Sequence, residues 1–241
     1  MQEIVVQAQP YELDGEPFEG QLLYVKGAQP RRALLMAPNF FGVSQSAIKL
    51  AHDLLTEDTV ILILDPYGKG VHPQDAEQAM AAMSSLRDDY NKLRKRLEGG
   101  VQALAMVAEE LGIGANNMAA FGFCFGGGCV LELARMGAPL KAFISFHGLL
   151  ETPEPSSSET PKGPVLVLNG ADDPMVSIDS RLAFEEEMAQ VGADWQVVNF
   201  GGAVHSFTDP EANVPGRSQY HPVVARRAFA MMYDLLDEVF R

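Results

Sequence analysis

The chain has 241 residues, 47% of them hydrophobic, and a formal net charge of -14 at pH 7. A chain of this length fits one α/β domain, so we expect a single domain over residues 1–241. The acidic balance argues against nucleic acid and anionic membrane surfaces as partners. No apolar run reaches the length of a membrane span, and the first residues lack the basic and apolar regions of a signal peptide.

The two cysteines, Cys124 and Cys129, lie five residues apart in one predicted turn and helix. A disulfide between them would distort that helix, so we expect two thiols, a reducing compartment and a cytoplasmic location. Neither a Cys/His pattern with metal-ligand spacing nor a phosphate-binding glycine loop is visible. We therefore expect no metal and no cofactor. We also expect a monomer or homodimer.

Strands and helices are predicted to alternate along most of the chain. A hairpin of strands over 4–8 and 18–25 comes first, joined by a turn at 13–16. Buried strands are then predicted where short apolar runs occur, at 33–37, 60–64, 117–121, 141–146, 165–169 and 195–200. Helices are predicted after Ser44, as one or two segments within 72–98, and at 101–111, 129–136, 178–191 and 223–240. A Ser/Pro-rich loop is predicted at 152–158.

This alternation predicts an α/β fold with a mostly parallel central sheet flanked by helices on both faces. Ligands of such sheets bind at the carboxyl ends of the strands. Asn39, Cys124, Asp173 and His205 each follow a predicted strand. We therefore expect the functional site at that edge.

The stretch Gly122-Phe123-Cys124-Phe125-Gly126 lies between a predicted strand and a predicted helix. It matches the tight turn that presents a nucleophile at the end of a strand, in which flanking glycines avoid a steric clash. The start of the following helix would stabilise a thiolate at Cys124. The alternative is a buried structural cysteine beside a glycine-rich packing turn.

A base and an acid follow the cysteine in the chain order of the α/β-hydrolases. His205 follows a glycine pair after the last predicted strand, and the alternative is a surface histidine. The acid is either Asp172 or Asp173, and we favour Asp173, the fourth position of its turn. The oxyanion hole is expected from the backbone N–H groups of Phe125 and Phe40.

Several aromatic side chains near these positions are candidates to line a substrate pocket. Aromatic residues are more often plain core, and that alternative stays open for each of them. Arg87 and Arg94 in the segment 72–98 could supply a cation to a substrate, although we favour the alternative that they lie on a solvated helix face. The pocket candidates that we retain are Phe41, Phe123, His147 and Phe207.

Together, the stretches Gly122–Gly127, Asn39–Val43, Gly170-x-x-Asp173 and His205-Ser206-Phe207 resemble the dienelactone hydrolase family (carboxymethylenebutenolidases). The resemblance spans nearly the whole chain, and the cysteine in the turn is its specific part. It implies an α/β-hydrolase fold and a Cys124–His205–Asp173 catalytic triad without a metal. The implied reaction is hydrolysis of a small-molecule carboxylic ester or lactone through a thioacyl-enzyme.

Two positions depart from the pattern of that family. Its characterised members carry a glutamate where this chain has Asn39, and an arginine where it has Asp209. Asn39 cannot take up a proton, and an acidic side chain at position 209 would repel an anionic substrate. We therefore expect a neutral or less acidic ester, with Asn39 at the substrate and His205 directly deprotonating Cys124.

Three other functions remain open from the residues alone. The chain could be a hydrolase-fold protein that binds a ligand without catalysis, or a thiol redox protein using Cys124 and Cys129. Five residues of helix turn the second thiol away from the first, which disfavours the redox function. A peptidase is a third possibility, because a fold does not determine a substrate.

Overall fold

The structure is a computed structural model that describes residues 3–153 and 159–241. Most of the loop predicted at 152–158 therefore lies outside the described residues. The chain divides into two compact units, residues 1–120 and 121–241, and the boundary falls within strand β5 (Met118–Phe123). The single domain expected over residues 1–241 stays a prediction.

The first unit opens with the predicted hairpin, whose strands are longer than the apolar pattern indicated. β1 (Ile4–Leu13) pairs antiparallel with β2 (Glu16–Val25) over their full lengths. The turn consists of Asp14 and Gly15, both with positive φ (51° and 81°), as a two-residue hairpin turn requires. β2 then pairs antiparallel with β4 (Thr59–Ile63), which runs parallel to β3 (Arg32–Ala37).

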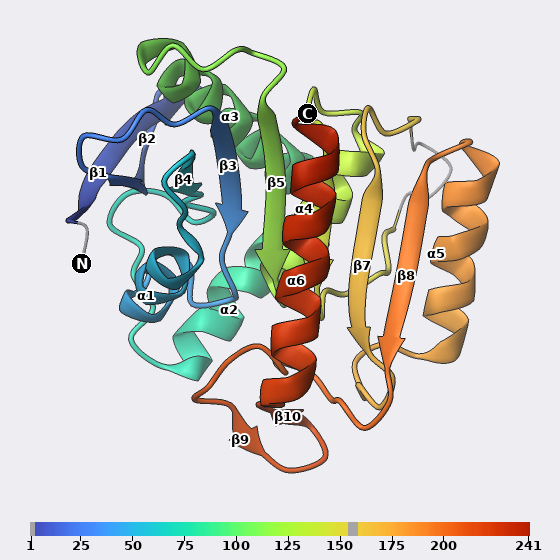
Figure 1. The fold of residues 1–241 in the computed structure, drawn as a ribbon. Helices are drawn as coiled ribbons and strands as arrows, with labels where there is room; N and C mark the ends of the chain where they lie inside the picture. Colours follow the sequence, from blue (N-terminus) through green and yellow to red (C-terminus); the bar gives the residue numbers. More distant parts are fainter. Residues whose placement is uncertain (1–2, 154–158) are drawn as a thin grey trace. The chain divides into compact units, whose positions relative to one another are not determined.

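Helices cover both faces of the strands in this unit (Figure 1). α1 (Gln45–Leu54) packs against β2 and β4, and it begins at the predicted cap, where the Ser44 hydroxyl accepts from the Ala47 N–H. The segment predicted as one or two helices forms α2 (Ala76–Arg87) and the start of α3 (Tyr90–Glu110). α3 packs against β1 and β3.

The predicted boundary between helices near residue 100 is wrong, because α3 runs without a break through Gly99 and Gly100. Both glycines are buried where the helix crosses other elements. A side chain at Gly100 would overlap Leu64, and one at Gly99 would lie 3.4 Å from Leu13. The glycines permit close packing here, and that packing outweighs their low helix propensity.

The second unit continues the alternation with parallel strands. β6 (Phe143–Phe146) pairs with β7 (Val165–Gly170), and β7 pairs with β8 (Trp195–Phe200). In Figure 1, α6 (Pro222–Val239) lies on the near side of the sheet, beside β7, and α4 (Phe125–Arg135) lies on its far side. The remaining elements are α5 (Ile178–Gln190) and a short hairpin that was not predicted, formed by β9 (Asn213–Val214) and β10 (Ser218–Gln219).

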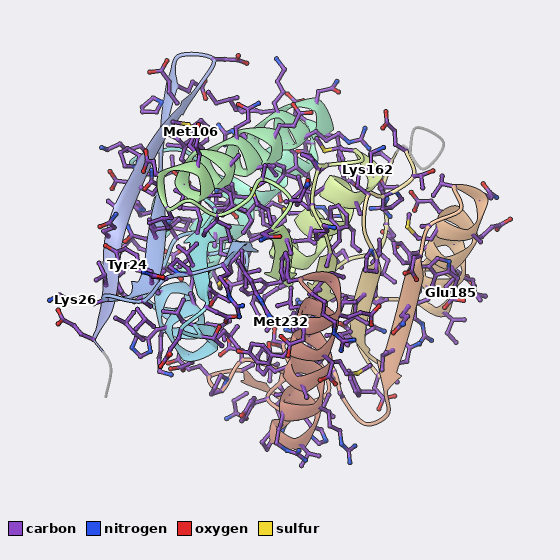
Figure 2. All side chains as sticks on the ribbon, turned by 45° about the horizontal axis from the view of Figure 1, so that its top comes forward. Tyr24, Lys26, Met106, Lys162, Glu185 and Met232 are labelled. Carbon is purple, nitrogen blue, oxygen red and sulfur yellow. The ribbon has the colours of Figure 1, made fainter. Side chains whose placement is uncertain are left out.

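The strand order β1-β2-β4-β3-β5-β6-β7-β8 makes a mostly parallel eight-stranded sheet flanked by six helices, which confirms the predicted fold class. The closing helix α6 is amphipathic as predicted, because Met232 (Figure 2) is buried whereas Arg227 and Asp234 are exposed. Within residues 3–153 and 159–241, every helix is too short or too polar to cross a membrane.

Candidate active site

Cys124 lies at the turn between β5 and α4 in a conformation that L-residues rarely adopt. Its φ is 55° and its ψ is -117°, and its side chain is half-buried. A Cβ atom at Gly122 would overlap the Gly126 carbonyl oxygen, so this position requires glycine. Strained backbone of this kind costs about 1–3 kcal/mol and persists where the surroundings impose it. The strain at Cys124 matches the turn that presents a nucleophile.

The next glycine has a packing role that the sequence pattern left open. A Cβ atom at Gly127 would lie 2.7 Å from the Ser145 hydroxyl oxygen and 2.8 Å from the Gly148 Cα. The first turn of α4 therefore runs directly against the end of β6. The Cys124 N–H is also tied to this strand, because it donates to the Phe146 carbonyl at 3.0 Å.

His205 lies in the loop between β8 and α6, and its side chain is buried. The unpredicted hairpin holds this loop, because the Gln219 N–H donates to the His205 carbonyl at 3.0 Å. The loop passes so close to the end of β7 that a Cβ atom at Gly170 would lie 2.8 Å from the Val204 carbonyl oxygen. The position of the imidazole therefore depends on contacts from β7 and β10.

The structure separates the two candidate acids. Asp173 Oδ2 lies 2.8 Å from His205 Nδ1, and Asp173 Oδ1 accepts from the Met175 N–H at 2.8 Å. The Asp172 side chain is exposed and accepts from the Gly202 N–H at 3.1 Å. Asp173 is thus the carboxylate that orients the His205 ring, and Asp172 supports the loop that leads to it.

The ionisation of His205 is controlled by its surroundings. Burial lowers its pKa, but the hydrogen bond with Asp173 and the charge of Cys124 outweigh burial and raise the pKa to about 10. The buried Nε2 atom has no hydrogen-bond partner among the described residues. The charge of the Cys124 sulfur nevertheless acts on the ring and favours its protonated form. Nε2 is the ring nitrogen that Asp173 does not contact.

A second histidine, His147, lies beside the first. The two ring centroids are 5.2 Å apart, and His147 is buried at the end of β6 with a positive φ of 39°. Its Nδ1 accepts from the Cys124 N–H at 3.2 Å, and its Nε2 lies 2.8 Å from the Thr208 hydroxyl oxygen. Sequence reasoning singled out His147 only as a pocket candidate. It missed Thr208, for which no sequence pattern gave a signal.

The loop after β3 belongs to the first unit. The Asn39 side-chain oxygen accepts from the Phe41 N–H at 3.0 Å, and the Asn39 backbone carbonyl accepts from the Gly42 N–H at 2.9 Å. The Tyr67 hydroxyl donates to the Phe40 carbonyl at 2.7 Å. The Phe40 N–H makes no hydrogen bond with any residue that the structure describes. Its role as an oxyanion donor stays a prediction, as does that of the Phe125 N–H at the start of α4.

The predicted pocket residues differ in exposure. Asn39 and Phe41 are half-buried, whereas Phe123 and Phe207 are buried. Contact of these side chains with a substrate also stays a prediction. Within the described parts of the chain, we find no group of three or more His, Cys, Asp or Glu residues that could hold a metal ion.

A mostly parallel sheet with a nucleophile-type residue on a strained strand-to-helix turn defines the α/β-hydrolases, and this fold is of that class. The chain belongs to the dienelactone hydrolase family, whose model matches residues 18–240. It is therefore a hydrolase of ester bonds, with an ester or a lactone as its substrate.

The chain is also similar to individual proteins. The chain is 31% identical to a dienelactone hydrolase-like promiscuous phosphotriesterase from metagenomic libraries, with 98% of both chains covered and a TM-score of 0.88. An uncharacterised protein of Caenorhabditis elegans is 35% identical over 157 residues, which are 64% of this chain and 98% of the relative. The fold also matches the dienelactone hydrolase of Anabaena variabilis (19% identity, 99% of both chains, TM-score 0.69).

Proposed function

We propose that the protein is a cysteine-dependent hydrolase of a small carboxylic ester or lactone, with Cys124, His205 and Asp173 as its catalytic triad. One observation carries the proposal. The buried pair of His205 and Asp173, 2.8 Å apart, lies in the same compact unit as Cys124 on its strained turn. A thiol on such a turn, with an oriented imidazole whose pKa is raised by Asp173 and by the sulfur, supports nucleophilic catalysis.

The proposed reaction proceeds in two steps. The Cys124 sulfur, having given its proton to His205 Nε2, attacks the carbonyl carbon and forms a tetrahedral oxyanion. The oxyanion collapses as the bond to the leaving oxygen breaks, and His205 gives its proton to that oxygen. Water, deprotonated by His205, then attacks the thioacyl carbon. The sulfur leaves as thiolate and the carboxylic acid is released. Asp173 stabilises the imidazolium throughout.

The substrate is proposed to be neutral or only weakly acidic. Asp209, four residues after His205, is half-buried, and a carboxylate there would repel an anionic substrate. Asn39 has no proton to exchange, so His205 alone would generate the thiolate. We also propose that the N–H groups of Phe125 and Phe40 stabilise the oxyanion, each contributing about 3 kcal/mol to the transition state.

The experiment is to incubate the protein with p-nitrophenyl esters of neutral acids and with dienelactone, and to measure intact mass during turnover. We expect hydrolysis of the neutral esters and a mass increase equal to one acyl group. Cys124→Ala should abolish both. Cys129→Ser is the matched control, because it removes the other thiol and should keep both.

Other results would contradict parts of the proposal. If no acyl adduct formed during turnover and Cys124→Ala still hydrolysed the esters, the thioacyl mechanism would be refuted. Fast turnover of dienelactone with none of the neutral esters would refute the substrate class. Loss of activity in Cys129→Ser would favour the thiol redox function instead. An iodoacetamide reaction at Cys124 whose rate is flat across pH would favour a binding protein without catalysis.

A second candidate activity is hydrolysis of phosphotriesters. It is favoured by the 31% identity over 98% of the chain to a protein described as a promiscuous phosphotriesterase. A phosphotriester is neutral, so it fits the same electrostatic argument as a neutral ester. Paraoxon included in the ester panel tests it, and turnover by the native protein but not by Cys124→Ala would assign both reactions to one nucleophile.

The cellular setting is part of the same proposal. A thiol nucleophile must stay reduced, and a cytoplasmic location provides this condition. We expect a monomer or homodimer, and sedimentation at micromolar concentration measures this directly.

A further inference from the structure

The Cys124 turn and the His205 loop are joined by one buried side chain, that of His147. Its Nδ1 atom is 3.2 Å from the Cys124 backbone nitrogen, whose N–H it shares with the Phe146 carbonyl at 3.0 Å. Its Nε2 atom is 2.8 Å from Thr208 Oγ1. Thr208 is three residues after His205 in the same loop. A single imidazole therefore bridges the segment that carries the proposed nucleophile and the segment that carries the proposed base.

The contact with Cys124 determines which nitrogen of His147 carries the proton. A backbone N–H can only donate, so Nδ1 accepts and the neutral ring carries its proton on Nε2. Nε2 then donates to the Thr208 hydroxyl, and both ring nitrogens are satisfied. A proton on Nδ1 would point at the Cys124 N–H and break this contact. The bridge therefore exists only while the His147 ring is neutral.

The surroundings of His147 favour that neutral form. The ring is 2% exposed, and it packs edge-on against Phe207 with centroids 5.1 Å apart. Burial lowers the pKa of His147 well below its ordinary value, and the charge on His205 lowers it further. The two neighbouring histidines are thus held in opposite states, with His205 charged and His147 neutral.

The backbone of His147 is as constrained as its ring. Its φ of 39° is uncommon for a residue other than glycine, although histidine adopts such angles more often than most residues do. Its N–H donates to the Leu168 carbonyl on β7 at 2.8 Å. Strained conformations of this kind are common at functional sites. In this backbone conformation the His147 ring lies against the Cys124 turn.

From these contacts we infer that His147 is a positioning residue, which bridges the Cys124 turn and the His205 loop and fixes the sulfur relative to the base. This inference rests on the proposed function. It gives His147 a task other than the substrate contact that the sequence suggested, because the ring acts through Cys124 and Thr208. A displacement of about 1 Å between reacting groups can cost about a hundredfold in rate.

Two variants of His147 separate its two contacts. In His147→Asn the side-chain oxygen takes the place of Nδ1 and can still accept from the Cys124 N–H. In His147→Gln the amide reaches towards Thr208, but the acceptor at the Nδ1 position is lost. We expect His147→Gln to lower kcat on a neutral ester about ten- to a hundredfold with little change in KM, and His147→Asn to recover most of that loss.

A second pair tests the other end of the bridge without altering the strained residue. Thr208→Val removes the hydroxyl and should lower kcat about tenfold, again with KM nearly constant. Thr208→Ser keeps the hydroxyl and should retain most of the native kcat. The melting temperature of every variant is measured to show that it folds. If the His147 variants do not fold, the Thr208 variants test the inference by themselves. Nitrogen chemical shifts of the native protein should show His147 protonated on Nε2 at neutral pH.

The possible results either support or overturn the inference. Loss of kcat in His147→Gln and Thr208→Val, with rescue by His147→Asn and Thr208→Ser, supports it. Native-like kcat in folded His147→Gln or Thr208→Val overturns it, as does a proton on Nδ1. A rise in KM at constant kcat in the His147 variants would indicate substrate contact instead.

If the native protein hydrolyses no ester and forms no acyl adduct, the proposed function fails and the inference fails with it. An active native protein with unaffected variants refutes the inference alone.

Discussion

Asp173 Oδ2 lies 2.8 Å from His205 Nδ1, and both side chains are almost completely buried. The neighbouring Asp172 points to solvent and makes its hydrogen bond to the Gly202 N–H. Two adjacent carboxylates therefore have separate tasks, and only one of them can hold the proposed base. This difference allows a test in which two nearly identical substitutions have different consequences.

Asp173→Asn should lower kcat on a neutral ester by about ten-thousand-fold, because the amide no longer holds the His205 tautomer or stabilises its charged form. Asp172→Asn should leave kcat close to the native value, since it changes an exposed group. Steady-state kinetics of the two variants measures the contrast. Equal losses in both would show that Asp173 has no special relation to the base.

The charge state of His205 can be observed directly. Its pKa is raised to about 10, so the ring should remain protonated from neutral pH until the pH rises through that value. Nuclear magnetic resonance titration of histidine ring shifts measures this. Asp173→Asn and Cys124→Ala should each lower the pKa, because each removes a group that favours the charged ring. A native His205 that titrates near pH 6.5 would contradict this account of the site.

Gly99 and Gly100 in α3 form a matched pair for stability. Replacing either by alanine improves helix propensity by about 1 kcal/mol. At Gly99 the new methyl group would be in ordinary contact with Leu13, so Gly99→Ala should raise the free energy of unfolding by about 0.5–1 kcal/mol. At Gly100 the methyl group would overlap Leu64, so Gly100→Ala should lower the free energy of unfolding by about 1–3 kcal/mol. Urea unfolding of both variants checks the opposite signs.

A buried charge cluster in the second unit should matter for stability more than for activity. Arg135 is 1% exposed, and its guanidinium contacts Glu187 at 2.8 and 2.9 Å and Glu132 at 2.8 Å. Arg135→Met leaves two buried carboxylates without their cation and should cost about 3–5 kcal/mol of unfolding free energy.

The control for this cluster removes the charges together. The combination of Arg135→Met with Glu132→Gln and Glu187→Gln should be more stable than Arg135→Met alone, because it leaves no uncompensated buried charge. The kcat of the folded fraction should be native-like in both. A triple variant that is less stable than the single variant would contradict the electrostatic explanation.

The sequence by itself determined the features that depend on local chemistry. Short unbroken apolar runs predicted the parallel strands, and Asp14-Gly15 predicted the hairpin turn, because such patterns restrict φ and burial within a few residues. The glycines around Cys124 predicted the strained turn for the same reason. The chain order of Cys124, Asp173 and His205 then predicted the class of protein.

The tertiary structure decided what depends on contacts between distant segments. It joined Asp173 rather than Asp172 to His205, and it kept α3 continuous through Gly99 and Gly100. It also brought His147 and Thr208 together across 61 residues of chain. Hydrogen bonds and close packing of this kind depend on where strands end in space. Local propensity contains no information about that position, so sequence reasoning could not supply it.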